Sequence, residues 1–365
     1  MIDERLLKNE EKAVFCLRSL YGKYGYSPFK MSKFEEYELY VKNKEFLVSD
    51  RAITFNDTNG QLLALKPDVT LSIIKSARDI PGEKQKVYYN ENVYRVSEST
   101  HRYKEIMQAG LECIGDIDLY DIYEVVSLAA QSLAAIGDEF VLEISNLGLL
   151  SGILERTCSS RAFCEKAIDF IKEKNSHDFL RLCNEYGIEK EKAEILTVFV
   201  SAYGERKKVI SELEKVCSKE ELSPLSKLSD LLDSSPFSER IVFDFSVVNN
   251  MNYYNGFVFR GFLNGVSERL LAGGQYDKMM KKMGKRSGAI GFAIYLDILE
   301  QLQNENEKTD VDVLLIYDND TKPREVAKKV SELISCGFTV SAQKTDSGKI
   351  KAKKIIDLRK EKNNA

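Results

Sequence analysis

The sequence of 365 residues predicts an α+β fold, with an antiparallel sheet flanked by helices, a helical insertion and a short α/β segment at the end. Three observations lead to this expectation. Helix-like and strand-like patterns alternate up to residue 146, residues 147–236 keep helical spacing, and a strand–helix–strand pattern follows a polar linker at 304–309. We therefore expect a core made of residues 1–146 and 237–303, an insertion at 147–236, and a separate piece at 310–365, in line with two or three domains for this length.

The first part of the core has recognisable boundaries. Helical spacing over Glu4–Tyr24 ends at Gly25, and the turn Asn56–Gly60 favours a hairpin because Asn-Gly suits a tight turn. The remaining elements expected here are a helix over Pro67–Arg78, strands over Lys86–Val96 and Tyr103–Ile114, a helix over Asp118–Ile136 and a strand over Phe140–Ser145.

The second part is less regular. Strands are expected over Ile241–Val248 and Phe257–Phe262, Gly273-Gly274 is expected to open a helix, and Ala289–Gln301 is apolar enough for either a strand or a helix. After the linker we expect strands over Val311–Tyr317 and Phe338–Ala342, a helix over Arg324–Ser335 between them, and a final basic, helix-like piece.

Composition excludes several classes of protein. No apolar run is long enough to span a membrane, and no apolar signal core follows the N-terminus, so we expect a cytoplasmic protein without a membrane segment. Seven scattered cysteines and two histidines form no metal-binding pattern, so neither a metal nor another cofactor is expected. The net charge of −4 makes nucleic-acid binding unlikely. The basic stretch from residue 344 to 365, with eight Lys/Arg and three Asp/Glu, is interpreted as a solvated, partly disordered end.

Candidate site residues lie on two neighbouring segments. On the strand Tyr103–Ile114, Gln108 and Glu112 share one face, roughly 13 Å apart at about 3.3 Å per residue, and Arg95 on the preceding strand can point to the same side. These residues form either a polar ligand site or a salt-bridged solvent face. Asp68 either caps the following helix or, with Thr70, holds a ligand ammonium group, and spacing alone favours the cap.

A further candidate is the segment Asn249–Arg260. It carries the pair Tyr253-Tyr254 on an expected strand-like hairpin, one ring inward and one outward, and no Lys or Arg before Arg260. Gly273-Gly274 is only a weak phosphate-loop candidate because the spacing of such a loop is missing.

Together and in this order, these pieces resemble histidyl-tRNA synthetase, a class II aminoacyl-tRNA synthetase, over about residues 5–300. Lys66-Pro67-Asp68-Val69-Thr70 resembles the family's Arg-Pro-Glu-Gly-Thr, whose acid and Thr bind the α-amino group of histidine. Tyr94-Arg95 and Gln108–Glu112 resemble the class II motif 2 hairpin, in which the Arg meets phosphate and carboxylate while the Gln and Glu line the pocket. The resemblance implies a class II core followed by a truncated anticodon-binding-like α/β remnant.

Two later motifs complete the resemblance. Asn252-Tyr253-Tyr254-Asn255 is similar to the Leu-Asp-Tyr-Tyr signature, in which the second Tyr faces the imidazole, and Ala272–Asp277 matches Ala-Gly-Gly-Arg-Tyr-Asp, which brings in Tyr276. Two departures concern ATP. Asn249 stands where the family has an Arg that assists attack of the carboxylate on ATP, and Ile298 stands where motif 3 has an Arg for the γ-phosphate.

The lost cations are typical of a synthetase-derived family, the regulatory subunits of ATP phosphoribosyltransferase in histidine biosynthesis. This resemblance implies a chain without catalysis of its own that activates a short catalytic subunit, forms a homodimer within a hetero-oligomer, and mediates feedback inhibition with L-histidine as the effector. The alternatives are a histidyl-tRNA synthetase with degenerate ATP motifs and a synthetase-like protein that binds an amino acid or tRNA. Asp68, Thr70, Arg95, Gln108, Glu112, Tyr253, Tyr254 and Tyr276 are the expected ligand-binding residues.

Overall fold

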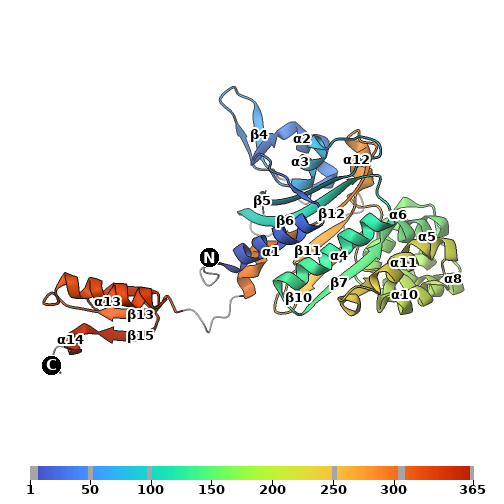
Figure 1. The fold of residues 1–365 in the computed structure, drawn as a ribbon. Helices are drawn as coiled ribbons and strands as arrows, with labels where there is room; N and C mark the ends of the chain where they lie inside the picture. The colour runs from blue at the N-terminus through green and yellow to red at the C-terminus, as the bar shows by residue number, and fades with distance from the viewer. Residues whose placement is uncertain (1–6, 48–51, 97–100, 249–252, 303–308, 362–365) are drawn as a thin grey trace. The chain divides into compact units, whose positions relative to one another are not determined.

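The protein consists of two compact units, residues 1–302 and 303–365, each with its own sheet (Figure 1). The computed structural model describes residues 7–47, 52–96, 101–248, 253–302 and 309–361. No helix in these ranges is long and apolar enough to cross a membrane.

A nine-stranded sheet forms the centre of the first unit, in the order β1-β5-β6-β12-β11-β10-β7-β9-β8. Most neighbours pair antiparallel, and only β1 with β5 and β7 with β9 run parallel. The strands are β1 Ser27–Pro28, β5 Gln85–Val96, β6 Tyr103–Gly115, β7 Phe140–Asn146, β8 Tyr203–Gly204, β9 Ile241–Asp244, β10 Phe257–Leu263, β11 Leu271–Gln275 and β12 Gly288–Tyr295. The long pair β5–β6 confirms the two strands predicted on either side of residues 97–102.

Two helices, α1 (Asn9–Lys23) and α4 (Leu119–Ile136), pack against each other and cover one face of this sheet (Figure 1). Asp118 caps α4 by accepting backbone N–H groups of Tyr120 and Asp121, as expected for an acidic N-cap. Leu17 and Tyr21 of α1 are fully buried here, and the Tyr21 hydroxyl pairs with Ser132 of α4 at 3.1 Å. Both predicted helices are therefore confirmed, although α1 begins at Asn9 and residues 4–6 of the predicted helix lie outside the described residues.

A small subdomain lies against the other face of the sheet. It contains the antiparallel sheet β2-β4-β3, whose hairpin turn lies at the predicted Asn56–Gly60. Its helix α3 (Val69–Ser76) begins after Asp68, whose carboxylate accepts the N–H of Leu71 at 2.9 Å. The other elements are β2 Phe34–Glu36, α2 Tyr37–Lys42, η2 Lys44–Phe46, β3 Thr54–Asn56 and β4 Leu62–Leu65.

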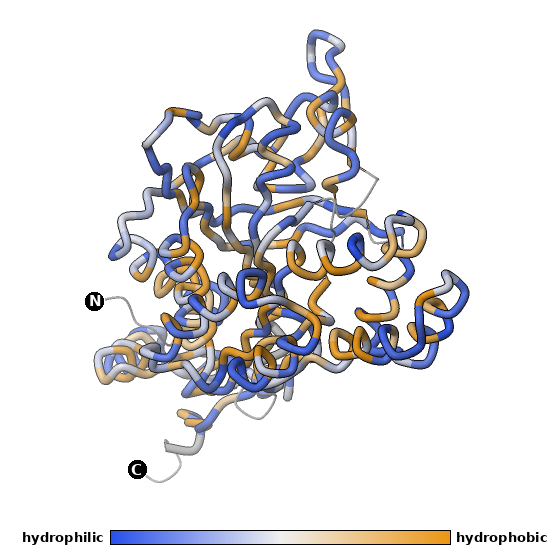
Figure 2. The backbone as a smooth tube through the Cα atoms, turned by 90° about the vertical axis from the view of Figure 1, so that its right-hand side faces the viewer, coloured by the Kyte–Doolittle hydropathy of each residue, from blue (hydrophilic) through white to orange (hydrophobic). Residues whose placement is uncertain are grey.

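The insertion is helical, as predicted, apart from the two-residue strand β8, which pairs with β9. Its helices are α5 Leu147–Thr157, α6 Arg161–Lys172, α7 Ser176–Glu185, α8 Lys190–Leu196, α9 Val198–Ser201, α10 Arg206–Leu213 and α11 Lys219–Leu232, followed by η3 Ser238–Arg240. Hydrophobic and hydrophilic residues alternate along these helices (Figure 2), because one face of each packs on a shared core.

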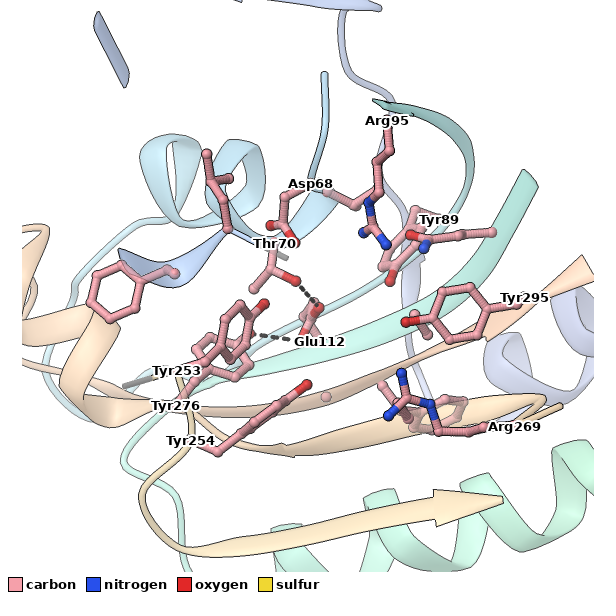
Figure 3. A pocket seen from close by; sticks show the side chains of 18 residues that line it. Asp68, Thr70, Tyr89, Arg95, Glu112, Tyr253, Tyr254, Arg269, Tyr276 and Tyr295 are labelled. Atoms are coloured by element: carbon pink, nitrogen blue, oxygen red, sulfur yellow. Dashed lines mark hydrogen bonds between the residues drawn. The ribbon is translucent and has the colours of Figure 1, made fainter. Parts of the chain in front are cut away.

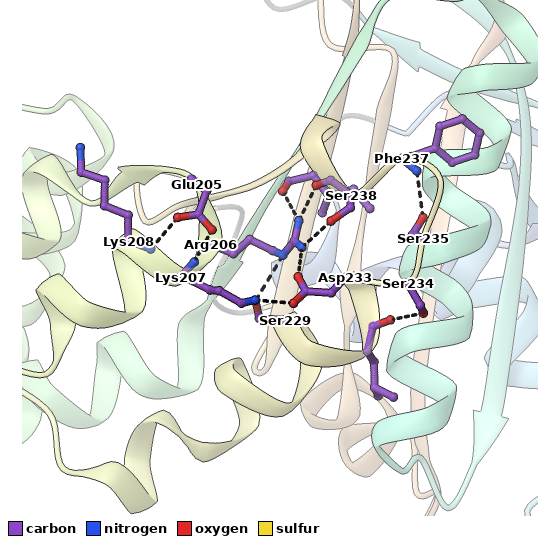
Figure 4. A network of polar contacts seen from close by, with 12 residues as sticks. Glu205, Arg206, Lys207, Lys208, Ser229, Asp233, Ser234, Ser235, Phe237 and Ser238 are labelled. Atoms are coloured by element: carbon purple, nitrogen blue, oxygen red, sulfur yellow. Dashed lines mark hydrogen bonds and ion pairs between the residues drawn. The ribbon is translucent and has the colours of Figure 1, made fainter.

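Arg206 connects the insertion to the return of the chain into the main sheet (Figure 4). Its guanidinium donates to Asp233 at 2.8 Å, to the Ser238 hydroxyl at 2.8 Å and to the carbonyl of Ile241 at 2.7 Å. The side chain is only 5% exposed. A buried arginine of this kind is tolerated because nearly every donor has an acceptor.

The second unit holds a parallel sheet in the order β14-β13-β15, with β13 at its centre. The elements are β13 Val311–Ile316, α13 Pro323–Ser335, β14 Val340–Gln343, β15 Ala352–Asp357 and α14 Leu358–Glu361. The predicted strand–helix–strand is confirmed. The expectation of a helix-like, partly disordered basic end is wrong for residues 352–357, which form a third strand paired with β13.

Two expectations for the core also need correction. Gly273-Gly274 does not open a helix or form a phosphate loop, because both residues lie inside β11, and α12 (Asp277–Lys282) begins later. A side chain at Gly273 would meet the carbonyl oxygen of Gly291 at 2.5 Å, so these glycines permit close strand packing. The apolar segment Ala289–Gln301 is divided between β12 and the 3-10 helix η4 (Leu296–Leu302).

Candidate functional site

A cavity of about 270 Å³ opens between the main sheet and the small subdomain (Figure 3). Its floor comes from β6 and β12, and its walls come from the start of α3 and the segments around β11. All eight residues predicted to bind a ligand line it, namely Asp68, Thr70, Arg95, Gln108, Glu112, Tyr253, Tyr254 and Tyr276. The structure thus brings these residues together, while the ligand itself remains a prediction.

Glu112 lies at the closed end of the cavity and is held by two hydroxyl groups. The Tyr276 hydroxyl donates to its Oε2 at 2.6 Å, and the Thr70 hydroxyl donates to its Oε1 at 3.0 Å. Gly291, the residue opposite Glu112 on β12, leaves space for the carboxylate, since a Cβ there would lie 1.7 Å from Oε2. The strand pairing and the glycine together fix where this carboxylate sits.

The environment of Glu112 favours its neutral form. Burial, together with the smaller effect of the nearby Asp68, raises the pKa of the Glu112 carboxyl to about 8, against the opposing effect of the two donated hydrogen bonds. Gln108 and Glu112 are 3% and 2% exposed, so the alternative of a salt-bridged solvent face is wrong. A buried carboxylate beside an open cavity can accept a hydrogen bond from a ligand cation or donate one when protonated.

Asp68 both caps α3 and lines the cavity, so the two interpretations of this residue are not exclusive. Burial raises the pKa of its carboxyl, while the Leu71 N–H and the positive charge of Arg95 lower it. Arg95 on β5 is positioned by its Nε, which donates to the carbonyl oxygen of Pro67 at 2.9 Å. The helix start and the arginine are thereby fixed relative to each other at the cavity wall.

The two neighbouring tyrosines lie in an irregular stretch before β10, not on a strand as predicted. Both line the cavity, with the Tyr253 and Tyr254 ring centroids 4.5 Å apart, so the expected inward–outward alternation is also wrong. Asn255 anchors this stretch, because its N–H donates to the Gln275 carbonyl and its side chain donates to Asp277 at 3.1 Å. Asn249 to Asn252 lie outside the described residues.

Sequence reasoning missed several lining residues. Arg269 precedes β11 and Tyr295 ends β12, and the guanidinium of Arg269 lies 5.9 Å from the centroid of the Tyr295 ring (Figure 3). Arg269 belongs to no motif found in the sequence, and Tyr295 stands where the end of motif 3 departs from the family but was not expected to line a site; the strand register places both here. Phe46, Leu47 and Tyr89 also line the cavity.

The motif 3 position shows how the chain departs from an ATP-binding arrangement. Ile298 lies in η4 and packs against the large hydrophobic core. An isoleucine in this setting provides no positive charge for a phosphate. Among the described residues there is also no group of three or more His, Cys, Asp or Glu side chains that could hold a metal ion.

Comparison with known proteins agrees with this architecture. A sequence model of the histidyl-tRNA synthetase family matches residues 2–299. The chain is 28% identical to the ATP phosphoribosyltransferase regulatory subunit of Acetivibrio thermocellus over 82% of its own length and 75% of the relative's. It is also 28% identical to the regulatory subunit of Clostridium kluyveri, over 91% and 88% of the two chains.

Solved structures share the fold at lower identity. A Bacillus halodurans protein described as an ATP phosphoribosyltransferase regulatory subunit/histidyl-tRNA synthetase aligns with a TM-score of 0.74 and 23% identity, over 98% of this chain and 96% of that one. A chain of the ATP phosphoribosyl transferase (HisG:HisZ) complex from Thermotoga maritima aligns with a TM-score of 0.62 and 22% identity, over 79% and 97%.

The match across residues 2–299 covers the whole main sheet, the small subdomain and the insertion. The large antiparallel sheet with flanking helices is the class II synthetase-like fold that the sequence predicted. The chain belongs to the histidyl-tRNA synthetase family and, within it, is similar over most of its length to ATP phosphoribosyltransferase regulatory subunits.

Proposed function

We propose that this chain is a non-catalytic regulatory subunit of ATP phosphoribosyltransferase, the first enzyme of histidine biosynthesis. In this role it activates a short catalytic subunit and mediates feedback inhibition by L-histidine. The names of its relatives support the regulatory role, and the similar Thermotoga maritima chain belongs to a complex of two different subunits, HisG and HisZ.

The observation that carries the proposal is the contrast between two parts of the synthetase frame. The cavity keeps a closed end with a fixed carboxylate and hydroxyl groups that suit an amino acid. The motif 3 position, by contrast, is an isoleucine packed against the core, and Asn249 replaces the other cation expected from the family. Loss of one transition-state stabiliser typically costs about a hundred- to a thousandfold in rate, so adenylation should be very slow.

Co-expression with a short catalytic subunit tests the proposal. The complex should transfer phosphoribosyl from PRPP to ATP much faster than either chain alone, and histidine should inhibit it. A complex that does not form, or a catalytic subunit unaffected by this chain, would contradict the proposal. Glu112→Ala should leave the complex intact and reduce its sensitivity to histidine if inhibition uses this cavity.

An active histidyl-tRNA synthetase is the second candidate, because two arginines, Arg95 and Arg269, still line the cavity. Histidine-dependent exchange of pyrophosphate into ATP distinguishes it. Exchange at the rate of a working synthetase would favour this alternative, and exchange near background would favour the regulatory role.

We also propose a cytoplasmic location and a symmetric homodimer within the hetero-oligomer, since closed two-fold assemblies are the commonest form of homo-oligomer. Light scattering of the purified chain at micromolar concentration should give twice the mass of 41.5 kDa. A monomeric mass would contradict the homodimer and leave the regulatory role to the co-expression test.

A further inference from the structure

We infer that Arg269 binds the carboxylate of an amino-acid ligand at the open end of the cavity, and that it makes a free carboxylate a requirement for binding. This inference rests on the proposed function, because it takes histidine as the ligand. It assigns the anionic end of that ligand to a residue outside every motif by which the chain resembles the synthetases.

The first support is position. Arg269 lies in the segment that leads into β11, and Figure 3 shows its guanidinium on the same side of the cavity as Tyr295. The guanidinium is 5.9 Å from the Tyr295 ring centroid, a distance at which the cation and the ring attract each other. The ring thus helps to hold the guanidinium at the cavity, and the planar fork of a guanidinium matches the geometry of a carboxylate.

The second support is the distribution of charge. The two carboxylates, Asp68 and Glu112, lie together beside the phenol groups of Tyr253 and Tyr276, whereas the guanidiniums of Arg95 and Arg269 lie on either side of Tyr295 (Figure 3). Arg95 lies beside Asp68 and balances its charge at the start of α3, whereas Arg269 brings positive charge to the cavity from a different segment, beside Tyr295. A small molecule with a cationic and an anionic end can place its cation near the Asp68 and Glu112 carboxyl groups and its anion near Arg269.

The third support concerns size and the second arginine. At about 270 Å³ the cavity is near the lower end of the roughly 300–1,000 Å³ typical of small-molecule sites, which suits an amino acid better than a nucleotide. Arg95 donates to the carbonyl of Pro67 through its Nε, which directs it toward the start of α3. Arg269 enters from a different segment and can approach the ligand from the opposite side.

Isothermal titration calorimetry with two ligands tests the inference. The unaltered chain should bind L-histidine at least tenfold more tightly than histamine, which lacks the carboxylate. Arg269→Gln should weaken histidine binding about tenfold to a hundredfold, because a charge-assisted hydrogen bond is lost, and should leave histamine binding unchanged. Arg269→Lys should recover part of the loss, since it restores the charge without the planar fork.

Arg286→Gln is the matched control, because it removes the same charge from a side chain that is 80% exposed and does not line the cavity. It should leave both affinities within twofold of the unaltered chain. Unchanged histidine affinity in Arg269→Gln, or equal weakening of histidine and histamine, would overturn the inference while leaving the regulatory role standing.

Two further outcomes are distinguishable. If Arg269→Gln abolishes binding of AMP and spares histidine, Arg269 serves a phosphate and the inference is wrong. If the unaltered chain does not bind histidine at all, the inference is wrong and so is the assignment of the cavity to an amino acid. Activation of the catalytic subunit in the co-expression assay would still support the regulatory role.

Discussion

The hydroxyl of Tyr276 donates a 2.6 Å hydrogen bond to Oε2 of Glu112, although the two residues are separated by 164 positions in the sequence. Their contact depends on β6, which carries Glu112, and on the end of β11, which positions Tyr276 next to α12. The closed end of the cavity is therefore assembled from both halves of the core, on either side of the insertion.

Tyr276→Phe should lower the unfolding free energy by removing one hydrogen bond at the closed end of the cavity, while the aromatic ring is kept. The buried Glu112 would lose one of its two hydroxyl donors, at a cost of about 1.5–3 kcal/mol when the carboxylate is charged. Urea denaturation at pH 9 should show the loss of unfolding free energy. Tyr103→Phe, at a tyrosine that is 76% exposed, should change it by less than about 0.5 kcal/mol.

Glu112→Gln should change how stability depends on pH. Because the pKa of Glu112 is raised to about 8 from 4.5, the native state keeps a proton that the unfolded chain has released between these values. The contribution of this residue to stability is therefore present below about pH 5 and is lost as pH rises toward 8. The unfolding free energy lost in this way as pH rises amounts to at most about 5 kcal/mol.

The glutamine variant carries no such proton, so its melting temperature should fall less than that of the unaltered chain between pH 5 and 8. Thermal melts followed by circular dichroism over this range provide the measurement. If the melting temperatures of the two proteins fall equally between pH 5 and 8, Glu112 titrates near its ordinary pKa.

Gly291→Ala should abolish ligand binding, because the added methyl group would lie 1.7 Å from Glu112 Oε2 and displace the carboxylate. We expect a loss of about 1–3 kcal/mol in unfolding free energy from overpacking as well. Gly152→Ala is the matched control, since its Cβ in α5 would meet nothing within 4 Å, and it should be neutral or stabilising by up to about 1 kcal/mol. Histidine calorimetry and urea denaturation of both variants separate the two effects.

Arg206→Ala should destabilise the junction between the insertion and the sheet. It leaves the buried carbonyl of Ile241 and the hydroxyl of Ser238 without their donor, which should cost about 2–5 kcal/mol. Arg161→Ala removes an 89% exposed partner of an i,i+4 ion pair and should cost less than about 0.5 kcal/mol. Equal denaturation midpoints for the two variants would show that the Arg206 network contributes little.

Glu112→Ala combined with Tyr254→Phe should remove histidine binding if the cavity accepts the imidazole. The double change removes the fixed carboxylate of Glu112 and the hydroxyl of Tyr254, while the Tyr254 ring position is kept by phenylalanine. Calorimetry of the double variant beside the unaltered chain gives the comparison. Unchanged binding would place histidine elsewhere, for example at a subunit interface.

Periodicity and capping residues were sufficient to predict several of the elements that position the cavity. The cap at Asp68, the strand that places Gln108 and Glu112 on one face, and the helix after Asp118 all follow from local rules. Gly273-Gly274 misled the prediction because a glycine pair signals a turn locally, whereas here it permits close strand packing. Arg269 and Tyr295 could not be found from the sequence, since the pairing of β11 with β12 and β6 decides what faces the cavity.

Through its hydrogen bond to Asp68, the backbone amide of Leu71 can report on whether the cavity is occupied. The same carboxylate that faces the cavity holds the backbone N–H of Leu71 at 2.9 Å in the first turn of α3. A ligand cation that binds the Asp68 carboxylate competes with the Leu71 N–H for it. Occupancy of the cavity should therefore alter the hydrogen-exchange rate and the chemical shift of the Leu71 amide. The state of the pocket can thus be followed from the backbone of a helix, without labelling the ligand.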